Sequence, residues 1–380
     1  MLSLGFPLAI SFYTFQQICF LADCHKNKAE EKNFLDYCLY VMFFPQLVAG
    51  PIVRHQEMMP QFAERGVRLP DWNNIATGVF VFGLGLFKKL IIADSFAQWA
   101  DAGFSSAGAL SFFEAWSVSL SYTFQLYYDF SGYTDMAIGA ALLFNIRLPI
   151  NFNSPYKALT IRDFWQRWHI TLSRWLRDYL YIPLGGNRKG TPRTLINIMV
   201  TFLICGIWHG AGWTFIVWGA LHGSALVVHR LWKAFGLRLP SPLSWLCTFL
   251  FINASWVFFR AESIPDGLRI LKAMVPLGIE SPALLTQIAK IDFAADFVTL
   301  WGLQGPLLST AHQLLFIVVF PLIAFAMPNT MQLIRFASYQ GRLAFKPTIV
   351  SASLLAVMLF VSFMAYLGNV SQSEFLYFNF

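Results

Sequence analysis

The sequence predicts an all-α protein that crosses a lipid bilayer many times, and three observations support this fold class. Of the 380 residues, 57% are hydrophobic, 17% are aromatic and only 12% are charged, whereas soluble domains carry about 25% charged residues. The mean hydropathy of +0.54 is also high. Apolar runs of about 20 residues, the length of helix that spans the hydrocarbon core, recur along the chain. The bilayer must therefore solvate most of the protein surface.

Eight apolar runs are predicted to be transmembrane helices, and two further runs would bring the total to ten. Short connections join them, so residues 1–380 are expected to form a single membrane domain. The eight runs are residues 2–22, 74–92, 114–128, 194–208, 212–232, 243–259, 312–327 and 347–368, and the two further runs are 35–49 and 132–146.

The start of the chain and its cysteines indicate neither a cleaved leader nor a cysteine framework. Met1 is followed directly by apolar residues without a basic region, so we expect no signal peptide and a chain that begins in a membrane segment. The five cysteines form no C-x-x-C pair. We expect them to be small core residues rather than metal ligands.

A basic segment spanning residues 147–193 indicates the orientation of the protein. It holds nine Lys and Arg residues against two Asp residues, a balance of +7 that equals the net charge of the whole chain. Basic loops stay on the cytoplasmic side, so we expect this amphipathic segment there. A second basic loop, residues 335–346, is predicted to be cytoplasmic for the same reason. The span 347–368 then places residues 369–380 in an extracytoplasmic tail.

The charge of the basic segment also allows a binding function. Clustered arginines recognise phosphates through charge-assisted, often bidentate hydrogen bonds. Membrane topology alone would explain the same charges, so both interpretations stay open. If a polyanionic cytosolic ligand docks here, the candidate residues are Arg162, Arg167, Arg174 and Arg188.

Residues 160–181 of this segment predict one amphipathic helix that lies along the membrane interface. Thr160 and Asp163 have the spacing of a capping box at its start. At 100° per residue, the apolar side chains share one face and most charged side chains lie opposite. His169 falls near the edge of the apolar face, where it is either a structural histidine bonded to a backbone carbonyl or a functional residue. The apolar face contains Phe164, Trp165, Trp168, Leu172, Trp175, Leu176 and Tyr179.

His209 is the main candidate for catalysis. It ends the run 194–208 within CGIWHGAGW, where three glycines weaken the helix. Non-helical backbone at membrane depth is tolerated where it lines a cavity. A neutral imidazole there can take a proton from a hydroxyl and return it to a leaving group, so we predict a general base. The alternatives are a buried histidine that joins two helices, or a metal site with His169 and His222, although no i, i+4 ligand pair supports a resident metal.

Two acidic residues lie in the apolar stretch YYDFSGYTD, residues 127–135. Ionisable groups inside a membrane mark functional sites by default, so Asp129 and Asp135 are candidates for binding substrate hydroxyls or orienting a histidine. The other interpretation is that they cap and link helices at a break near Gly132. Proline and glycine also interrupt FFPQLVAGPIVR, residues 43–54, which predicts a kinked or re-entrant segment.

Together these segments resemble the membrane-bound O-acyltransferase family, in the bacterial branch that includes alginate O-acetyltransferase and the D-alanyl transfer protein of teichoic acid synthesis. The motifs that carry the resemblance extend from one end of the chain to the other and are jointly highly specific. They are PLAISFYTFQ (7–16), FFPQLVAGPIVR (43–54), YYDFSGYTDMAIG (127–139), FWQRWHITLSRWLRDYLYIPLGGNRKG (164–190), GIWHGAGWTFIVWGALHG (206–223) and FLYFNF (375–380).

This resemblance implies a ring of tilted helices around a central funnel, through which acyl groups pass. It implies that His209 is the catalytic histidine and that His169 is the second motif histidine. The acyl donor in the family is a cytosolic thioester, either a coenzyme A ester or an acylated carrier protein, rather than a permanently bound cofactor. Its phosphates would suit the basic segment. Acyl groups usually leave through a separate extracytoplasmic transferase.

The two ends of the chain add two expectations to the resemblance. Similar C-terminal tails are thought to carry a tyrosine that accepts the acyl group, here Tyr377, although an aromatic belt that anchors the terminus would use the same residues. Relatives usually carry further helices before the segment that matches residues 7–16. We therefore expect either an internal start at Met1 or a shortened protein.

On this resemblance we predict an acetyltransferase of the bacterial inner membrane that moves acetyl from acetyl-CoA or an acylated carrier protein toward an exopolysaccharide such as alginate. The expected partners are membrane lipids, the cytosolic donor and an extracytoplasmic acetyltransferase, with no nucleic acid. Two alternatives stay open. One is a proton-coupled transporter or flippase that uses Asp129, Asp135 and His209, although no internal repeat supports it. The other is an inactive scaffold for the periplasmic transferase.

Overall fold

The computed structural model describes residues 10–30, 33–106, 108–275, 310–336 and 344–368, together with Ser373, Phe375 and Leu376. Throughout these residues the regular secondary structure is helical, as predicted. The α-helices are α1 (Ile10–His25), α2 (Phe34–Met42), α3 (His55–Ala63), α4 (Trp72–Phe87), α5 (Asp94–Ser105), α6 (Phe112–Leu142), α7 (Ile161–Trp165), α8 (Ile170–Trp175), α9 (Gly190–His209), α10 (Trp213–Ala234), α11 (Ser241–Arg260), α12 (Ile264–Ala273), α15 (Thr310–Ala326), α16 (Thr330–Leu333) and α17 (Ile349–Leu367). Short 3-10 turns are η1 (Phe44–Gln46), η2 (Arg65–Arg68) and η4 (Pro155–Lys157), and π-helical segments are η3 (Lys88–Ala93) and η5 (Leu176–Tyr181).

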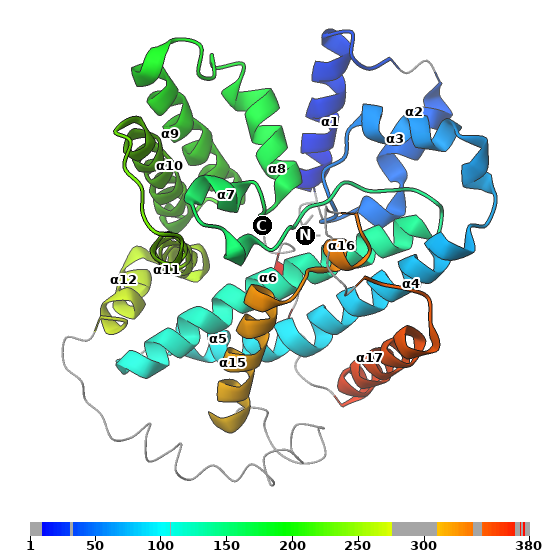
Figure 1. The fold of residues 1–380 in the computed structure, drawn as a ribbon. Coiled ribbons are helices and arrows are strands. Elements are labelled where there is room, and N and C mark those ends of the chain that lie inside the picture. The colour runs from blue at the N-terminus through cyan, green and yellow to red at the C-terminus, as the bar shows by residue number, and fades with distance from the viewer. Residues whose placement is uncertain are drawn as a thin grey trace, which may run out of the picture.

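Helix α6 runs through the middle of the molecule for 31 residues, and α4 and α5 lie beside it (Figure 1). In this view α9 to α11 lie to the upper left of α6 and α1 to α3 to its upper right, while α15 and α17 lie below it. The predicted break near Gly132 is wrong, because α6 continues through it and joins the predicted spans 114–128 and 132–146. The ring around a central funnel stays a prediction.

Glycine lets α4 and α6 pack with their backbones in contact. A Cβ atom at Gly132 would lie 2.8 Å from the carbonyl oxygen of Gly85, and one at Gly85 would lie 2.5 Å from the carbonyl oxygen of Gly132. Gly78 and Gly139 form a second pair, with corresponding distances of 2.7 and 2.6 Å to the opposite carbonyl oxygen. Small residues at such contacts are expected inside a membrane, where van der Waals packing drives the association of helices.

Four helical segments among the described residues are long and apolar enough to cross a membrane. They are the continuous segment Trp72–Ser105, which contains α4, η3 and α5, and the helices α9, α11 and α17. The described parts of the predicted runs 2–22, 212–232 and 312–327 are also helical, in α1, α10 and α15. The chain is therefore a multi-pass membrane protein, as its composition predicts.

The predicted run 35–49 does not form a span. Helix α2 ends at Met42, and the chain continues through η1 and a turn into extended backbone that is buried from Pro51 to Val53. The backbone N–H of Ile52 donates to Thr171 Oγ1 at 3.1 Å, so the protein itself satisfies a donor that lipid would leave unpaired. The prediction of a kinked segment over residues 43–54 is confirmed.

Candidate active site

The basic segment is broken at His169, so the predicted single interfacial helix over residues 160–181 is wrong. It forms α7, a turn, α8 and η5. His169 has left-handed backbone angles, with φ of 41° and ψ of 55°. A right-handed helix cannot continue through a residue with left-handed angles, which are also unfavourable for residues with a Cβ atom, and α8 begins only after His169. The break therefore orients the His169 side chain differently from a residue at the same position in a continuous helix.

Backbone hydrogen bonds from a distant segment stabilise this break. Ile170 N–H donates to the carbonyl oxygen of Asn151, and Asn153 N–H donates to the carbonyl oxygen of Arg167, both at 2.9 Å. These bonds satisfy groups that the interrupted helix leaves unpaired. Local periodicity contains no information about such long-range partners, which explains why the sequence pattern suggested one helix.

The predicted apolar face of the segment is confirmed, but its partner is protein. Six of the seven predicted side chains are buried, and Tyr179 is half-buried. The Trp165 ring lies 5.0 Å from that of Phe202 in α9, and the Trp175 ring lies 4.1 Å from that of Phe15 in α1, measured between centroids. The segment is thus an inner wall between α1 and α9.

His169 is 1% exposed and its tautomer follows from its hydrogen bonds. Its Nδ1 atom lies 3.1 Å from Asn151 Oδ1. The same amide oxygen accepts the backbone N–H of Thr171 at 3.2 Å and the Thr171 hydroxyl at 2.9 Å. Because this atom acts as an acceptor, Nδ1 must carry the proton and Nε2 the lone pair in the neutral imidazole.

His209 is the last residue of α9 and lies among aromatic rings. It is 3% exposed. The centroids of Trp208, Phe259 and Trp218 lie 4.5, 4.9 and 5.1 Å from that of the imidazole. Helix α9 ends here and α10 begins at Trp213, so the predicted glycine-rich break is confirmed.

Phe12 of α1 links the two motif histidines. Its ring stacks on His169 with centroids 6.2 Å apart and contacts Trp208 at 5.9 Å in an edge-on arrangement. Trp208 lies against His209. His169, just before α8, and His209, at the end of α9, are therefore brought into one aromatic-walled site, with α1 completing it.

His222 has a structural role. Ser255 Oγ donates to the carbonyl oxygen of Ile252 at 2.8 Å, so the same hydroxyl can accept the N–H of His222 Nε2, which lies 3.1 Å away. Trp165 Nε1 donates to His222 Nδ1 at 3.2 Å. Both ring nitrogens of His222 are used in hydrogen bonds to other segments, so neither is available for catalysis or for binding a metal ion. Within the described ranges, no group of three or more His, Cys, Asp or Glu residues is placed to hold a metal ion.

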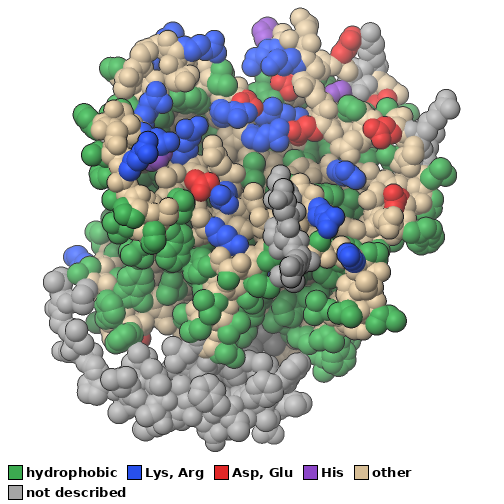
Figure 2. Space-filling model, viewed as in Figure 1, with side chains coloured by type: hydrophobic (Ala, Val, Ile, Leu, Met, Phe, Trp, Pro, Cys, Tyr) green, Lys and Arg blue, Asp and Glu red, His purple; other side chains and the backbone are tan. Residues whose placement is uncertain are grey.

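A cavity of about 1000 Å³ lies between the basic segment and the helices α9 and α10. Its apolar part reaches Trp165, Phe202 and Ile170, the residue after His169. Figure 2 shows Lys and Arg side chains gathered over this part of the molecule, above a region whose described side chains are mostly hydrophobic. The described lining residues include five cations and no acid, and the cations are Arg162, Arg174, Arg177, Arg230 and Lys233.

The structure separates the four arginines proposed to bind the donor. Arg162 and Arg174 line the cavity, and Arg174 also pairs with Glu57. Arg167 pairs instead with Asp163 at 2.7 Å and, like Arg188, is not part of the lining. The sequence pattern of a basic segment could not make this distinction.

The nearby carboxyl group of Asp178 is neutralised by two arginines. Asp178 lies 2.6 Å from both Arg54 and Arg177. Partial burial alone would raise the pKa of Asp178, but its hydrogen bonds with Arg177 and Arg54 hold that pKa below its ordinary value. The group stays ionised and paired, so it offsets part of the positive charge of Arg177 at the cavity, whereas Arg162, Arg230 and Lys233 line the cavity without such a pairing to Asp178.

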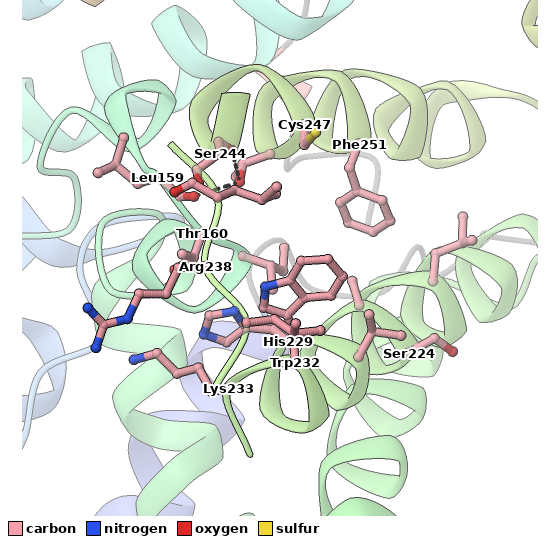
Figure 3. A pocket seen from close by; sticks show the side chains of 17 residues that line it. Leu159, Thr160, Ser224, His229, Trp232, Lys233, Arg238, Ser244, Cys247 and Phe251 are labelled. Atoms are coloured by element: carbon pink, nitrogen blue, oxygen red, sulfur yellow. Dashed lines mark hydrogen bonds between the residues drawn. The ribbon is translucent and has the colours of Figure 1, made fainter. Parts of the chain in front are cut away.

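A second cavity, of about 660 Å³, lies between α10 and α11. Figure 3 shows Lys233 and Arg238 at one end of it and Cys247 and Phe251 toward the other. His229 and Lys233 line both cavities. The C-terminal turns of α10 therefore form the wall between them.

Asp129 and Asp135 pair with two lysines that sequence reasoning missed. Lys89 Nζ lies 2.8 Å from Asp129 Oδ1, and Lys88 Nζ lies 2.6 Å from Asp135 Oδ2. The lysines are consecutive residues of η3, where the π-helical turn widens the helix, and π-helical turns are frequent at functional sites. Two lysines inside the apolar run 74–92 were the signal that could have found them. These ion pairs favour the helix-linking interpretation of the two aspartates.

Described residues of the C-terminal tail lie in the core next to this site. Phe375 is 5% exposed, and its ring lies 4.5 Å from Tyr133 and 6.2 Å from Phe130, between centroids. Phe130 contacts His169 at 4.8 Å. Tyr377 lies outside the described residues, so its role in acyl transfer and the extracytoplasmic position of the tail stay predictions.

Comparison with known proteins identifies the family. The profile of the membrane-bound O-acyltransferase family matches residues 26–260. A peptidoglycan O-acetyltransferase of Helicobacter pylori is 47% identical over 100% of this chain and 75% of its own length. Probable alginate O-acetylases AlgI of Azotobacter vinelandii and Pseudomonas putida are 41% and 39% identical, over 78% and 98% of this chain and 61% and 75% of their own lengths. A Bacillus subtilis teichoic acid D-alanyltransferase is 26% identical over 67% of this chain and 69% of its own length.

The family match covers the broken basic segment, the cavity beside it and both motif histidines. Its description and the acetyltransferase names of the relatives agree with the chemistry that a buried histidine next to a cationic cavity can perform. The chain is an acyltransferase and belongs to the membrane-bound O-acyltransferase family.

Proposed function

We propose that this protein, in the bacterial inner membrane, transfers an acetyl group from a cytosolic thioester toward a cell-envelope polysaccharide. The observation that carries the proposal is the cavity with five cationic lining residues, whose apolar part reaches the residue after His169. Phosphates of coenzyme A or of a carrier protein's phosphopantetheine arm match its charge. The thioester end would then point toward the aromatic-walled site of the two histidines.

His209 acts as the general base in this proposal. The acceptor hydroxyl attacks the thioester carbonyl carbon while the imidazole takes its proton. A C–O bond forms, the C–S bond breaks, and the proton passes from the imidazole to the departing thiolate. His169, with Nδ1 held by Asn151, keeps its ring in one orientation beside Phe12 and helps to position the donor. Tyr377 is the proposed first acceptor, and an extracytoplasmic acetyltransferase is the proposed next one.

The names of the relatives support a polysaccharide as the final acceptor. One is a peptidoglycan O-acetyltransferase and others are probable alginate O-acetylases. Both names refer to O-acetylation of a polysaccharide, and we propose that the acetyl group crosses the membrane to reach it. The rival proposal of a proton path through Asp129 and Asp135 is weakened because both carboxylates are held by lysines.

Sided membrane vesicles test the direction of transfer. We expect inverted vesicles, whose cytoplasmic face is outside, to move labelled acetyl from external acetyl-CoA or acetylated carrier protein to an acceptor in the lumen. Right-side-out vesicles with the same external donor should show no transfer, because the cavity faces their interior. Equal transfer by both kinds of vesicle would contradict the proposed orientation. The donor that works in inverted vesicles identifies the thioester.

Removing cations from the cavity should weaken donor binding. In Arg162→Gln and Arg230→Gln we expect the KM for the donor to rise about tenfold or more, because each lost charge-assisted hydrogen bond contributes about 1.5–3 kcal/mol, while kcat changes little. Arg193→Gln is the matched control, since Arg193 belongs to the same basic segment but is not part of the cavity lining. An equal rise of KM in the control would mean that overall charge, rather than the cavity, attracts the donor.

A further inference from the structure

Lys89 is at the centre of a buried cluster that includes the C-terminal tail. Its Nζ atom lies 2.8 Å from Asp94 Oδ1 and 2.8 Å from Asp129 Oδ1. It also donates to the carbonyl oxygen of Ser373 at 2.8 Å and to the Ser373 hydroxyl at 3.0 Å. Only 13% of the Lys89 side chain is exposed, and 2% and 1% of those of the two aspartates.

The tail supplies hydrogen-bond donors to the two carboxylates of this cluster. Two carboxylates face one ammonium group, which leaves an excess of negative charge in a buried place. Ser373 Oγ donates to Asp94 Oδ1 at 2.6 Å, and the backbone N–H of Leu376 donates to Asp129 Oδ2 at 3.1 Å. Each carboxylate thus receives one hydrogen bond from the tail. Buried charges need such donors to be stable, so Ser373 and Leu376 are part of the cluster.

We propose that Lys89 is a positioning residue that holds the C-terminal tail beside the histidine site. Ser373 and Leu376 are bound by the cluster, and Phe375 between them packs on Tyr133 and Phe130. Phe130 in turn contacts His169. The inference deepens the proposed function and rests on it, because Tyr377 is the next residue after Leu376.

The adjacent lysine provides a matched control. Lys88 also belongs to η3 and also forms a buried ion pair with α6, through Asp135. Its second partner is Thr330 of α16, at 2.8 Å, instead of the tail. Replacing either lysine by methionine removes one buried cation at the same depth. Only the loss of Lys89 should release the tail.

Hydrogen–deuterium exchange of the C-terminal peptide tests the proposal without using enzyme activity. In purified full-length protein we expect Lys89→Met to speed exchange of the Leu376 amide at least about tenfold, as loss of one charge-assisted hydrogen bond would. Lys88→Met should leave that amide protected. Ser373→Ala, which removes only the tail hydroxyl, should give a smaller increase in the exchange rate of the Leu376 amide. This variant tests the proposal if Lys89→Met does not fold. Wild-type protection in Ser373→Ala and in any folded Lys89→Met would overturn the proposal.

A second measurement separates this inference from the acyl-relay proposal. Mass spectrometry of the tail after incubation with labelled donor should show less acetyl on Tyr377 in Lys89→Met, with kcat lowered and donor KM unchanged. If Tyr377→Phe keeps full activity while Lys89→Met still exposes the Leu376 amide, the tail is held as proposed and the relay is wrong. If the Leu376 amide exchanges as fast in the wild type as in an unfolded peptide, Lys89 does not hold the tail.

Discussion

His209→Ala is expected to lower the rate of acetyl transfer by a factor of about 10²–10⁴, the contribution that a positioned general base makes. The side chain is 3% exposed among Trp208, Trp218 and Phe259, so solvent has little access to replace the missing imidazole. The rate is measured with labelled donor and purified protein, and polysaccharide acetyl content is measured in cells. The KM for the donor should change much less than kcat, because the cationic cavity stays intact.

The control for this substitution is His25→Ala, an exposed histidine at the end of α1. It should retain wild-type activity at a matched protein level. Wild-type acetylation in His209→Ala would remove the general-base role and point to His169 instead. Tyr377→Phe is compared with His209→Ala. If Tyr377→Phe is active and His209→Ala is not, His209 remains the general base and Tyr377 is excluded as an acyl acceptor.

Gly132→Leu is expected to prevent correct folding of the membrane domain. Its Cβ atom would lie 2.8 Å from the carbonyl oxygen of Gly85, and backbone cannot move aside as a flexible side chain can. Forcing α4 and α6 apart would also disturb the Lys88 and Lys89 ion pairs, which join the same two segments. We expect the free energy of unfolding to fall by about 3 kcal/mol or more, which is the upper end of the range for overpacked cores. The amount of monodisperse protein in detergent and its melting temperature are the measurements.

Gly66→Leu tests whether introducing a leucine by itself lowers the yield or the melting temperature. Gly66 is exposed in η2, and a Cβ atom there would have no neighbour within 4 Å. This variant should keep wild-type yield and melting temperature. If Gly132→Leu also kept both, the close approach of α4 and α6 would not be a requirement of the fold.

Sequence patterns predicted local properties of the site well. The apolar face of residues 160–181, the end of a helix at His209 and the irregular segment at 43–54 are all present in the structure. These features depend on residues close together in the chain, whose periodicity or glycine content is visible in the sequence. The predicted break at Gly132 was wrong for a related reason. A glycine that weakens a helix and a glycine that allows a close helix contact look the same until the neighbour is known.

The sequence by itself determined that the protein lies in a lipid bilayer, that it is helical and which residue types form the active site. Composition and motif spacing show these properties because they do not depend on packing. Only the tertiary structure decided which residues share that site. Phe12 joins His169 to the neighbour of His209, two of four candidate arginines line the cavity, and Lys89 binds both Asp129 and the tail. Each of these contacts connects segments far apart in the chain. Their partners are set by how helices pack in three dimensions, and no local pattern encodes that arrangement.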